Sequence, residues 1–494
     1  MEDRINDQQQ SRLDKLEKLI EMGINPYGER FDIDCYSKEI IDKYKDFSKE
    51  ELEDKSVVLR VAGRIMTKRR MGKLGFMHLL DRDGQIQVVV NKAIVSEEKY
   101  ELFKMADIGD IVGISGVVFK TNTGELSIRA NNYIHLTKAL RPLPEKFHGL
   151  VDIEERYRRR YLDLITNEDS RYIAITRPKI IRAIQNFFDN KGLIEVETPI
   201  LHSILGGAAA KPFITYHNTL DMNFYLRIAT ELPLKRLIVG GLSGVYEIGR
   251  LFRNEGMDAT HNPEFTSVEA YIAFKDMNDM MELCESLFQE VSMKINNTTE
   301  LEYKGHSISL KAPFKRIRMV DMIRDTIEIN FDDIRDLKQA LLLAKQHDIT
   351  VLKHQESIGH IISLFFDKYC EDNIIEPTFV YDYPIEISPL AKYNSKDHRY
   401  SDRFELFING KEYANAFSEL NDPIDQKERF EMQLRSKELG DLEATEMDID
   451  YIEALEYGLP PTGGIGIGID RLVMLLTNKD SIREVILFPH MKHR

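Results

Sequence analysis

The stretch IGRLFRNEGMDATHNPEFTSVEAY, from Ile248 to Tyr271, constrains the fold most, because two apolar runs flank a loop crowded with polar and charged residues. In both flanks apolar and polar residues alternate with a period of two, which is typical of half-buried β-strands rather than helices. Consecutive strands joined by a loop, with no helix between them, pair antiparallel. The stretch therefore predicts an α+β fold with an antiparallel sheet flanked by helices, rather than a regular βαβ alternation.

Length and charge limit the class of protein. The chain has 494 residues and 43% hydrophobic content, enough for two or three domains with sizeable cores. No run approaches the roughly 18 apolar residues of a membrane helix, and the N-terminus lacks the pattern of a signal peptide, so we expect a cytoplasmic protein with no membrane partner. The net charge of -15 argues against a protein that coats nucleic acid with its whole surface.

The first part of the chain predicts a small barrel. An amphipathic helix with Leu13, Leu16 and Leu19 on one stripe indicates an N-terminal helical extension over residues 1–55. Residues 56–140 contain about five short alternating runs, with turn signals at Asp83-Gly84 and Thr123-Gly124. A closed OB-fold barrel that binds single-stranded nucleic acid fits this pattern, although the strand count alone also fits a sandwich.

Basic residues gather in the first of these runs. They lie between positions 60 and 73, where no acidic residue interrupts them: Arg60, Arg64, Lys68, Arg69, Arg70 and Lys73. Such a cluster is either a solvated face of a strand and loop or a local surface for a nucleic acid. Composition alone does not separate these two interpretations.

The remainder predicts a linker and a second domain. Pro142 and Pro144 indicate a linker over residues 141–155, which is followed by a domain over 156–494. A helix is expected over 177–192, and a strand after it should stop near Pro199. Residues from about 297 to 375 lack polar motifs and favour a mostly helical insertion.

A glycine-rich run near the C-terminus, GGIGIGIDR, does not have the spacing of a dinucleotide or P-loop motif. Alternating Gly and Ile instead predict a strand with one face free of side chains, leading into a helix near Asp470 and Arg471. A flat ligand could lie on that face, or another element could pack closely against it.

Further polar residues suit a triphosphate and its metal. A hairpin turning at Asn409-Gly410 would bring the Glu405 and Glu412 carboxylates together, and Mg²⁺ between phosphates prefers such oxygen ligands. Taken alone, two hairpin glutamates are commonly only solvated. In the opening stretch, Arg253 could hold a phosphate bidentately and Phe265 could offer an aromatic face to a base.

These motifs resemble the class II aminoacyl-tRNA synthetases, and among them the bacterial type of lysyl-tRNA synthetase. Three ordered segments carry the resemblance over nearly the whole chain: FFDNKGLIEVETPIL, VYEIGRLFRNEGMDATHNPEFTSVEAY and GLPPTGGIGIGIDRLVMLL. The segments RPLPEKFHG, YRRRYLDL, GGAAAKPF and FSELNDP are similar to ones typical of the lysine enzyme. The sequence departs from relatives at Pro233, where a larger residue is usual, and at Ala416, where some have glycine.

The resemblance implies a six-stranded antiparallel catalytic sheet, an anticodon-reading OB-fold and a homodimer. The implied partners are tRNA(Lys), ATP and L-lysine, with Mg²⁺ as cofactor bound by Glu405 and Glu412. Arg253 and Arg471 would act in catalysis. For ATP the implied contacts are Arg253, Glu255, His261, Asn262, Phe265, Glu412, Gly466 and Arg471. For lysine they are Gly207, Glu231, Arg253, Glu269, Tyr271, Asn415, Phe417 and Glu419. For the anticodon they are Phe76, Gln87, Glu125 and Arg69.

The chemistry of lysine agrees with this implied pocket. Its two ammonium groups need carboxylates such as Glu231, Glu269 and Glu419, and its carboxylate needs a cation such as Arg253. An enzyme for aspartate or asparagine would not place acids there. A paralogue that has lost catalysis would be expected to lose Arg253 or Arg471, and an elongation-factor lysylating paralogue would lack the OB-fold. The expected function is therefore activation of lysine with ATP and its transfer to tRNA.

Overall fold

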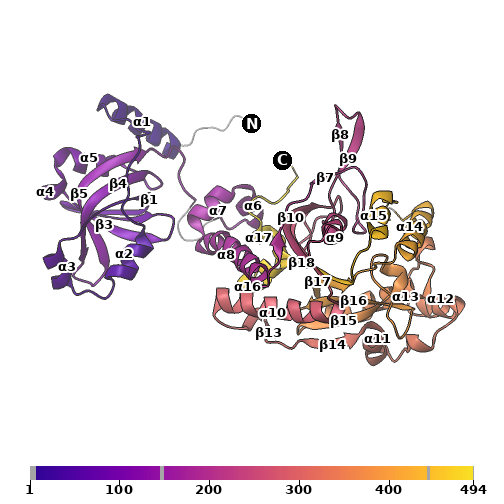
Figure 1. Cartoon of the computed structure of the whole chain (residues 1–494). Helices are drawn as coiled ribbons and strands as arrows, with labels where there is room; N and C mark the ends of the chain where they lie inside the picture. Colours follow the sequence, from indigo (N-terminus) through magenta and orange to yellow (C-terminus); the bar gives the residue numbers. More distant parts are fainter. Residues whose placement is uncertain (1–6, 145–149, 442–445, 493–494) are drawn as a thin grey trace. The chain divides into compact units, whose positions relative to one another are not determined.

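The computed structural model describes residues 7–144, 150–441 and 446–492, and the chain forms two compact units, Met1–Val151 and Asp152–Arg494 (Figure 1). The predicted linker over 141–155 includes residues 145–149, which lie outside the described residues, as does part of the segment RPLPEKFHG.

The first unit is a closed barrel, as predicted, and not a sandwich. Its five strands have the order β1-β2-β3-β5-β4. Buried and more exposed positions alternate along β2, so that one face fills the barrel. Gly124 has φ +84° in the turn between β4 and β5, a conformation that favours glycine. The elements are α1 (Asp7–Glu21), α2 (Ser37–Tyr44), α3 (Lys49–Lys55), β1 (Val58–Met71), β2 (Leu74–Leu80), β3 (Gln85–Asn91), α4 (Lys92–Val95), α5 (Glu97–Met105), β4 (Ile111–Lys120) and β5 (Leu126–Thr137).

The second unit is built on an eight-stranded sheet of order β14-β15-β16-β17-β18-β11-β10-β6. The implied six-stranded sheet is therefore too small: the six strands from β15 to β10 pair antiparallel, and two edge strands add to them in parallel, β14 on β15 and β6 on β10. The strand expected before Pro199 is present as β6, although it ends at Glu195, whereas alternation did not reveal the very short β14. The strands are β6 (Ile194–Glu195), β10 (Gly244–Phe252), β11 (Glu264–Ala273), β14 (Lys315–Arg318), β15 (Thr378–Pro384), β16 (Tyr400–Ile408), β17 (Lys411–Ser418) and β18 (Thr462–Gly468).

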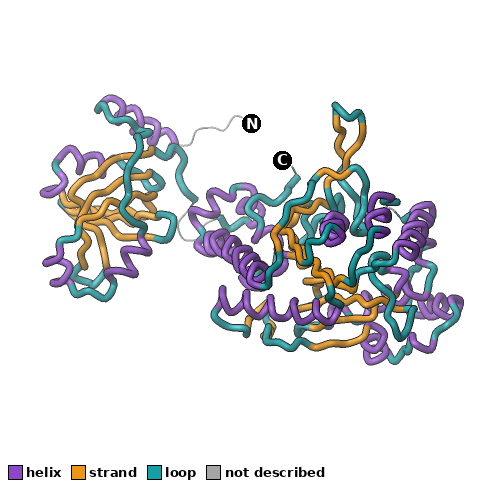
Figure 2. Tube along the Cα trace, viewed as in Figure 1, coloured by secondary structure: helices purple, strands orange, loops and turns teal. Residues whose placement is uncertain are grey.

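Helices surround this sheet (Figure 2). One apolar cluster joins buried residues of α8 and α10 to Ile465 and Ile467 of β18, and a second joins α9 and α15 to Tyr271 of β11. The helices are α6 (Ile153–Arg158), α7 (Arg160–Thr166), α8 (Glu168–Asn190), α9 (Glu231–Val239), α10 (Met277–Asn296), α14 (Pro423–Glu438), α15 (Ile449–Glu456), α16 (Ile469–Thr477) and α17 (Ile482–Val485).

Helix α8 begins nine residues before the predicted start at 177, because Pro178 lies inside the helix rather than near its beginning. Its ring is exposed, and Asn167 caps the true start by accepting a hydrogen bond from the Asp169 amide at 3.1 Å. A smaller sheet of order β7-β9-β8 lies between β6 and α9 in the chain. Its strands are β7 (Leu201–His202), β8 (Ile214–His217) and β9 (Met222–Leu226).

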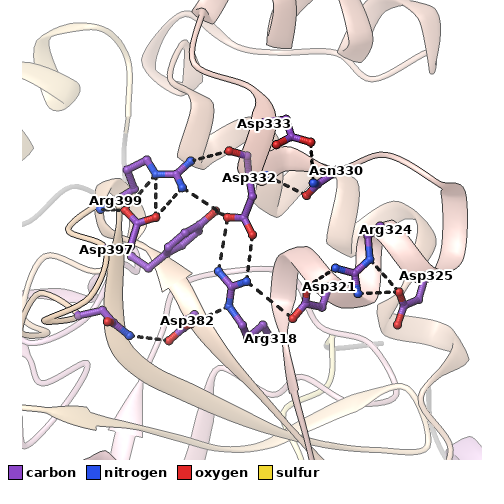
Figure 3. A network of polar contacts seen from close by, with 12 residues as sticks. Arg318, Asp321, Arg324, Asp325, Asn330, Asp332, Asp333, Asp382, Asp397 and Arg399 are labelled. Carbon is purple, nitrogen blue, oxygen red and sulfur yellow. Dashed lines mark hydrogen bonds and ion pairs between the residues drawn. The ribbon is translucent and has the colours of Figure 1, made fainter.

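Residues 297–375 are less helical than predicted, since they also hold the hairpin β12 (Glu300–Tyr303) and β13 (His306–Ser309) and the edge strand β14. The segment has its own apolar cluster around Phe331 and Phe365. A polar network centred on Arg318 lies beside it (Figure 3). The helices here are α11 (Met319–Ile327), α12 (Leu337–Gln346) and α13 (Ile358–Tyr369), with 3-10 turns η1 (Phe331–Asp333), η2 (Lys353–Gln355), η3 (Glu371–Asn373) and η4 (Ile385–Ile387) nearby. No helix among the described residues is long and apolar enough to cross a membrane.

Candidate active site

A cavity of about 480 Å³ lies in the second unit, against strands β10, β11, β16, β17 and β18. Every residue that the sequence assigns to ATP, lysine or a metal lines it. They are Gly207, Glu231, Arg253, Glu255, His261, Asn262, Phe265, Glu269, Tyr271, Glu405, Glu412, Asn415, Phe417, Glu419, Gly466 and Arg471. The structure thus brings together residues that are more than 260 positions apart in the chain.

The register of the sheet explains this convergence. Side chains directly opposite each other on neighbouring strands point to the same face, as do alternate residues of one strand. The sheet carries two such rows, one of Glu405, Asn415, Gly466 and Glu269, and the other of Arg403, Phe417, Gly464 and Tyr271. Both rows line the cavity, and the two glycines leave a floor without side chains at their centre.

The glycine at 464 leaves room for neighbouring side chains. A Cβ atom there would collide with the carboxylate of Glu419 and would come within 2.6 Å of the Tyr271 ring. At Gly466 the nearest atom to such a Cβ is Glu269 Cγ at 3.6 Å, an ordinary contact. Gly464 therefore makes room for the protein's own groups, whereas Gly466 leaves open surface for a ligand.

Three carboxylates mark one end of the cavity. Glu231, Glu269 and Glu419 are 7%, 8% and 1% exposed. Glu269 accepts hydrogen bonds of 3.1 Å from the Thr230 amide and from the Tyr271 hydroxyl. Burial, together with the charge of Glu231, raises the pKa of Glu269 to about 7. This end of the cavity is suited to a cationic ligand.

Lys235, which no sequence motif indicates, contacts two of these carboxylates. Its Nζ donates to Glu231 Oε1 at 2.6 Å and forms an ion pair with Glu419 Oε2. The only local signal is the spacing of Glu231 and Lys235, which places both on one face of α9. That spacing is common on solvent-exposed helices and does not by itself indicate a site.

Arg253 lies near the aromatic side of the cavity. Its guanidinium lies over the Phe265 ring, with Cζ 5.3 Å from the ring centroid, and its Nε is buried without a hydrogen-bond partner. The backbone amide of Arg253 donates to Pro263 O at 2.8 Å, which closes the loop that follows β10. A buried donor without a partner is suited to an anionic ligand.

The loop between β10 and β11 places His261 beside Arg471. Asp258 accepts the His261 backbone amide at 2.8 Å and contacts His261 Nδ1 at 2.8 Å, while His261 Nε2 lies 3.2 Å from Arg471 Nη2. Arg471 also donates to the carbonyl of Glu412 at 2.5 Å. Asn262 donates to Glu264 O at 2.6 Å. These contacts gather polar side chains and one arginine at the edge of the cavity.

Glu405 and Glu412 lie on the two strands of a hairpin that turns at Asn409 and Gly410, as predicted from the turn residues. Glu405 accepts hydrogen bonds from Arg403 at 2.6 Å and from the Tyr383 hydroxyl at 2.9 Å. Burial and the charge of Glu412 raise the pKa of Glu405 to about 7. Within the described residues no group of three or more His, Cys, Asp or Glu side chains is arranged to hold a metal ion by itself.

In the barrel, the four residues assigned to the anticodon form two contacting pairs. The Arg69 guanidinium lies 4.9 Å from the centroid of the half-buried Phe76 ring, and these residues are opposite each other on β1 and β2. Gln87 donates to a carboxylate oxygen of Glu125, whose other oxygen lies 3.2 Å from His78 Nε2. His78 stands opposite Gln87 in the sheet.

Three of the six basic residues between positions 60 and 73 have partners within the protein. Arg60 forms an ion pair with Asp34 at 2.8 Å, Arg64 donates to Gly109 O at 2.7 Å, and Lys68 donates to carbonyls of Lys104 and Ala106. Burial lowers the pKa of Lys68 to about 8. Three of the six basic groups are thus engaged within the protein, and Arg69, Arg70 and Lys73 remain exposed near the turn.

Comparison with protein families agrees with both units. A model described as tRNA synthetases class II (D, K and N) matches residues 152–492, and one described as an OB-fold nucleic acid binding domain matches residues 59–136. The chain belongs to the class II tRNA synthetases. The letters D, K and N denote aspartate, lysine and asparagine, so the family alone does not separate these three substrates.

Similarity to individual synthetases extends over the full chain. Relatives named lysine–tRNA ligase include those of Bacillus cytotoxicus, 56% identical over 100% of this chain and 98% of the relative, and of Lactococcus lactis subsp. lactis, 58% identical over 99% of each. The lysine–tRNA ligase of Bacillus subtilis is 55% identical over 100% of this chain and 98% of its own length. The similarity covers both the catalytic and the OB-fold regions of the present chain.

Proposed function

We propose that this synthetase activates L-lysine with ATP and transfers the lysyl group to the 3′-terminal ribose of tRNA(Lys). The observation that carries the proposal is the arrangement of three buried carboxylates and one arginine around a single cavity, in a chain similar over its full length to lysine–tRNA ligases. A dicationic amino acid with one carboxylate complements that set of charges. Aspartate would place a second carboxylate among the acids, and burying like charges together is costly.

The substrate lysine is proposed to bind with its side chain toward Glu419 and Tyr271. Its α-ammonium would meet Glu231 beside Gly207, and its carboxylate would meet Arg253. Asn415, Phe417 and Glu269 would complete the pocket. Each charge-assisted hydrogen bond contributes roughly 1.5–3 kcal/mol, whereas an ammonium buried without a carboxylate costs several kcal/mol. Neutral amino acids of similar length would leave the buried carboxylates without a partner and would be rejected.

ATP is proposed to occupy the glycine floor. Its adenine would stack between Phe265 and Arg471 near Gly466, and its triphosphate would bend toward His261 and Asn262, with Glu255 near the nucleotide. Activation requires no protein base, because the lysine carboxylate is already an anionic nucleophile. It attacks the α-phosphorus, pyrophosphate leaves, and Arg253 and Arg471 neutralise the charge that develops. The residues thus act by alignment and charge stabilisation.

Mg²⁺ is proposed as the metal. The residues fit it, since Glu405 and Glu412 lie on one hairpin beside the cavity, and a cation shared with phosphate oxygens needs only one or two protein carboxylates. Burial and, after it, the charge of Glu412 raise the pKa of Glu405, and a cation would relieve the repulsion between the two carboxylates. When bound with ATP, Mg²⁺ neutralises phosphate charge and favours the bent conformation of the triphosphate.

The barrel is proposed to bind the anticodon. Phe76 would stack on an unpaired base, while Gln87 and Glu125 would bond to base edges and Arg69 to the backbone. The half-buried Phe76 ring and the exposed basic side chains at one turn support this assignment. We also propose that the enzyme works in the cytoplasm, where its tRNA and ATP are present.

A homodimer is proposed as the working state. Several large apolar side chains are exposed around β6 and the small β7-β9-β8 sheet, and such groupings mark protein interfaces. They are Ile194, Ile200, Leu201, Ile214, Tyr216, Leu220 and Met222. A second copy of the chain is the proposed partner, and the mass in solution would test this.

The proposed function is tested by exchange of pyrophosphate into ATP, measured with Mg²⁺ and each of the twenty amino acids in turn, without tRNA. Exchange with lysine alone is expected. Exchange with aspartate or asparagine instead would reassign the substrate within the family. Folded protein that exchanges with no amino acid would contradict catalysis and favour a regulator that only binds tRNA.

A further inference from the structure

The strongest feature outside the assigned site residues is the buried lysine on α9. The side chain of Lys235 is 0% exposed and does not line the cavity, yet its Nζ bridges two carboxylates that do, Glu231 and Glu419. A substrate in the cavity therefore cannot touch Lys235. It can act only through the carboxylates that it holds.

The position of Glu419 makes this bridge specific. Its Oε2 forms the ion pair with Lys235, neither oxygen has a hydrogen-bond partner, and Oε1 lies over the bare Cα of Gly464. A carboxylate with one oxygen in an ion pair and the other without any partner is arranged to receive a second ammonium group. The resident ammonium of Lys235 thus fixes the direction from which an incoming one can bind.

The ion pairs of Lys235 with Glu231 and Glu419 also affect the charge balance of the pocket. Glu231, Glu269 and Glu419 carry three negative charges when ionised, and Lys235 reduces their sum to minus two. Lysine brings two ammonium groups to this end of the proposed pocket. With Lys235 present, the buried charges of pocket and substrate cancel, and buried charge without a counter-ion is costly.

We propose that Lys235 is a positioning and specificity-determining residue, an internal counter-ion that favours the ionised form of Glu419 and orients its carboxylate to accept the side-chain ammonium of the substrate. This inference rests on the proposed function. It predicts that the pocket selects a dication because Lys235 offsets one of three negative charges and leaves the other two for the substrate.

The titratable groups around Lys235 shift the pKa of Glu419 in opposite directions. Burial raises the pKa of Glu419 well above its usual range, and Lys235 opposes that rise, while Glu231 and Glu269 add to it. Burial alone would lower the pKa of Lys235, but the charges of Glu231 and Glu419 raise it above the ordinary value. The other polar groups nearby are Tyr451 on α15, Tyr271 on β11 and Arg403 on β16.

The test is Lys235→Met, with lysine-dependent pyrophosphate exchange measured from pH 6 to 9. Without the ammonium, Glu419 retains its proton to higher pH, and until that proton leaves it accepts from an ammonium only through a weaker, uncharged oxygen. The KM for lysine should rise about tenfold or more at pH 7 and approach the wild-type value near pH 9. In the pH profile of kcat/KM for lysine, the fall on the acid side should lie at least about one pH unit higher than in the wild type. The kcat at saturating lysine should change less than about threefold.

A second readout does not depend on catalysis. Calorimetry of lysine binding in buffers of different ionisation enthalpy should show that Lys235→Met releases more protons than the wild type at pH 7. Lys138→Met is the matched control, because Lys138 is 1% exposed and bridges Asp107 and Asp110 in the barrel at 2.8 and 2.9 Å. It removes a comparable buried bridge and should leave the pH profile unchanged.

The single variant could fold poorly because it leaves a buried carboxylate without its counter-ion. The double variant Lys235→Met with Glu231→Gln removes one charge of each sign and therefore avoids this imbalance. The fall on the acid side of its pH profile should return to within about half a pH unit of the wild type, although its KM stays raised. Two results would overturn the role of Lys235. One is a KM for lysine that rises by the same factor at every pH in Lys235→Met, and the other is a double variant whose pH profile stays shifted like that of the single variant. Wild-type protein that neither binds nor activates lysine would overturn the proposed function itself.

Discussion

At the residue scale, Glu419 is a buried carboxylate with a buried counter-ion. Its carboxylate is 1% exposed and is shared between Lys235 and the cavity. Glu419→Gln should weaken lysine activation by about tenfold or more in kcat/KM, since the loss of one charge-assisted bond to an ammonium costs about 1.4 kcal/mol or more. The measurement is pyrophosphate exchange at varied lysine concentration, with ATP saturating.

The control for this variant is Glu285→Gln on α10. Glu285 is 6% exposed and accepts from the Phe314 amide at 2.9 Å, so it matches Glu419 in burial but does not line the cavity. It should change stability without changing the KM for lysine. An unchanged kcat/KM in Glu419→Gln would remove Glu419 from the lysine pocket.

Residues separate clearly into those that the sequence could indicate and those that it could not. The opening stretch pointed to Arg253, His261 and Phe265 because their loop is short and unusually polar, and the structure places all three on the cavity. Lys235 escaped because a lysine four residues after a glutamate is ordinary on a helix. The partners of Arg60 and Arg64 could not be found from local sequence, because Asp34 and Gly109 are distant along the chain.

At the element scale, one polar network ties the inserted segment to the sheet. Arg318, at the end of β14, donates to Asp382 at 2.9 Å and to Asp332 at 3.0 Å (Figure 3). Asp332 also accepts from the Tyr400 hydroxyl at 2.8 Å and contacts Arg399 at 3.4 Å. Asp382 has φ +60° at an irregularity of β15 and holds Asn394 at 2.9 Å. The network thus links β14, η1, β15 and the loop before β16.

Asp332→Asn tests this network. Burial alone would raise the pKa of Asp332, but hydrogen bonds from Arg318 and Tyr400 lower it below its ordinary value. Its contribution is therefore complete above about pH 4 and is lost as pH falls through the lowered pKa. We expect a loss of about 1–2 kcal/mol in the free energy of unfolding at pH 7, shrinking below about pH 4, measured by urea denaturation.

Asp325→Asn is the control for this element. Asp325 is 58% exposed and pairs only with Arg324 among the described residues, so its loss should change stability by less than about 0.5 kcal/mol. Equal effects of the two variants, or an effect of Asp332→Asn that persists undiminished at low pH, would contradict the ionic character of the network.

Strands could be predicted where the alternation of residue types continues over several positions. The alternation of Gly and Ile in β18 predicted a bare face, and the structure places Gly464 and Gly466 on it while Ile465 and Ile467 enter the core. The charged strand β14 gave no such pattern, because pairing at a sheet edge depends on the neighbouring strand rather than on local sequence. Pro178 led to a helix start predicted too late, because its exposed position inside α8 depends on the tertiary fold.

At the scale of the whole molecule, the chain divides into two units with separate cores and separate candidate sites. The proposed lysine and ATP residues all lie in Asp152–Arg494, and the proposed anticodon residues all lie in Met1–Val151. Activation of lysine without tRNA should then be insensitive to changes on the barrel surface. Charging of tRNA should require both units.

Phe76→Ala tests this division. Stacking of a base on an aromatic ring contributes roughly 1–3 kcal/mol, so the KM for tRNA should rise about fivefold to a hundredfold, while lysine-dependent exchange without tRNA stays within about twofold of the wild type. Phe47→Ala is the matched control, since the half-buried Phe47 lies between α2 and α3 of the same unit, with the Lys55 ammonium 5.2 Å from its ring centroid. If both variants raised the KM for tRNA equally, the effect would belong to barrel stability. If Phe76→Ala impaired exchange as much as charging, the two units would not divide the reaction in this way.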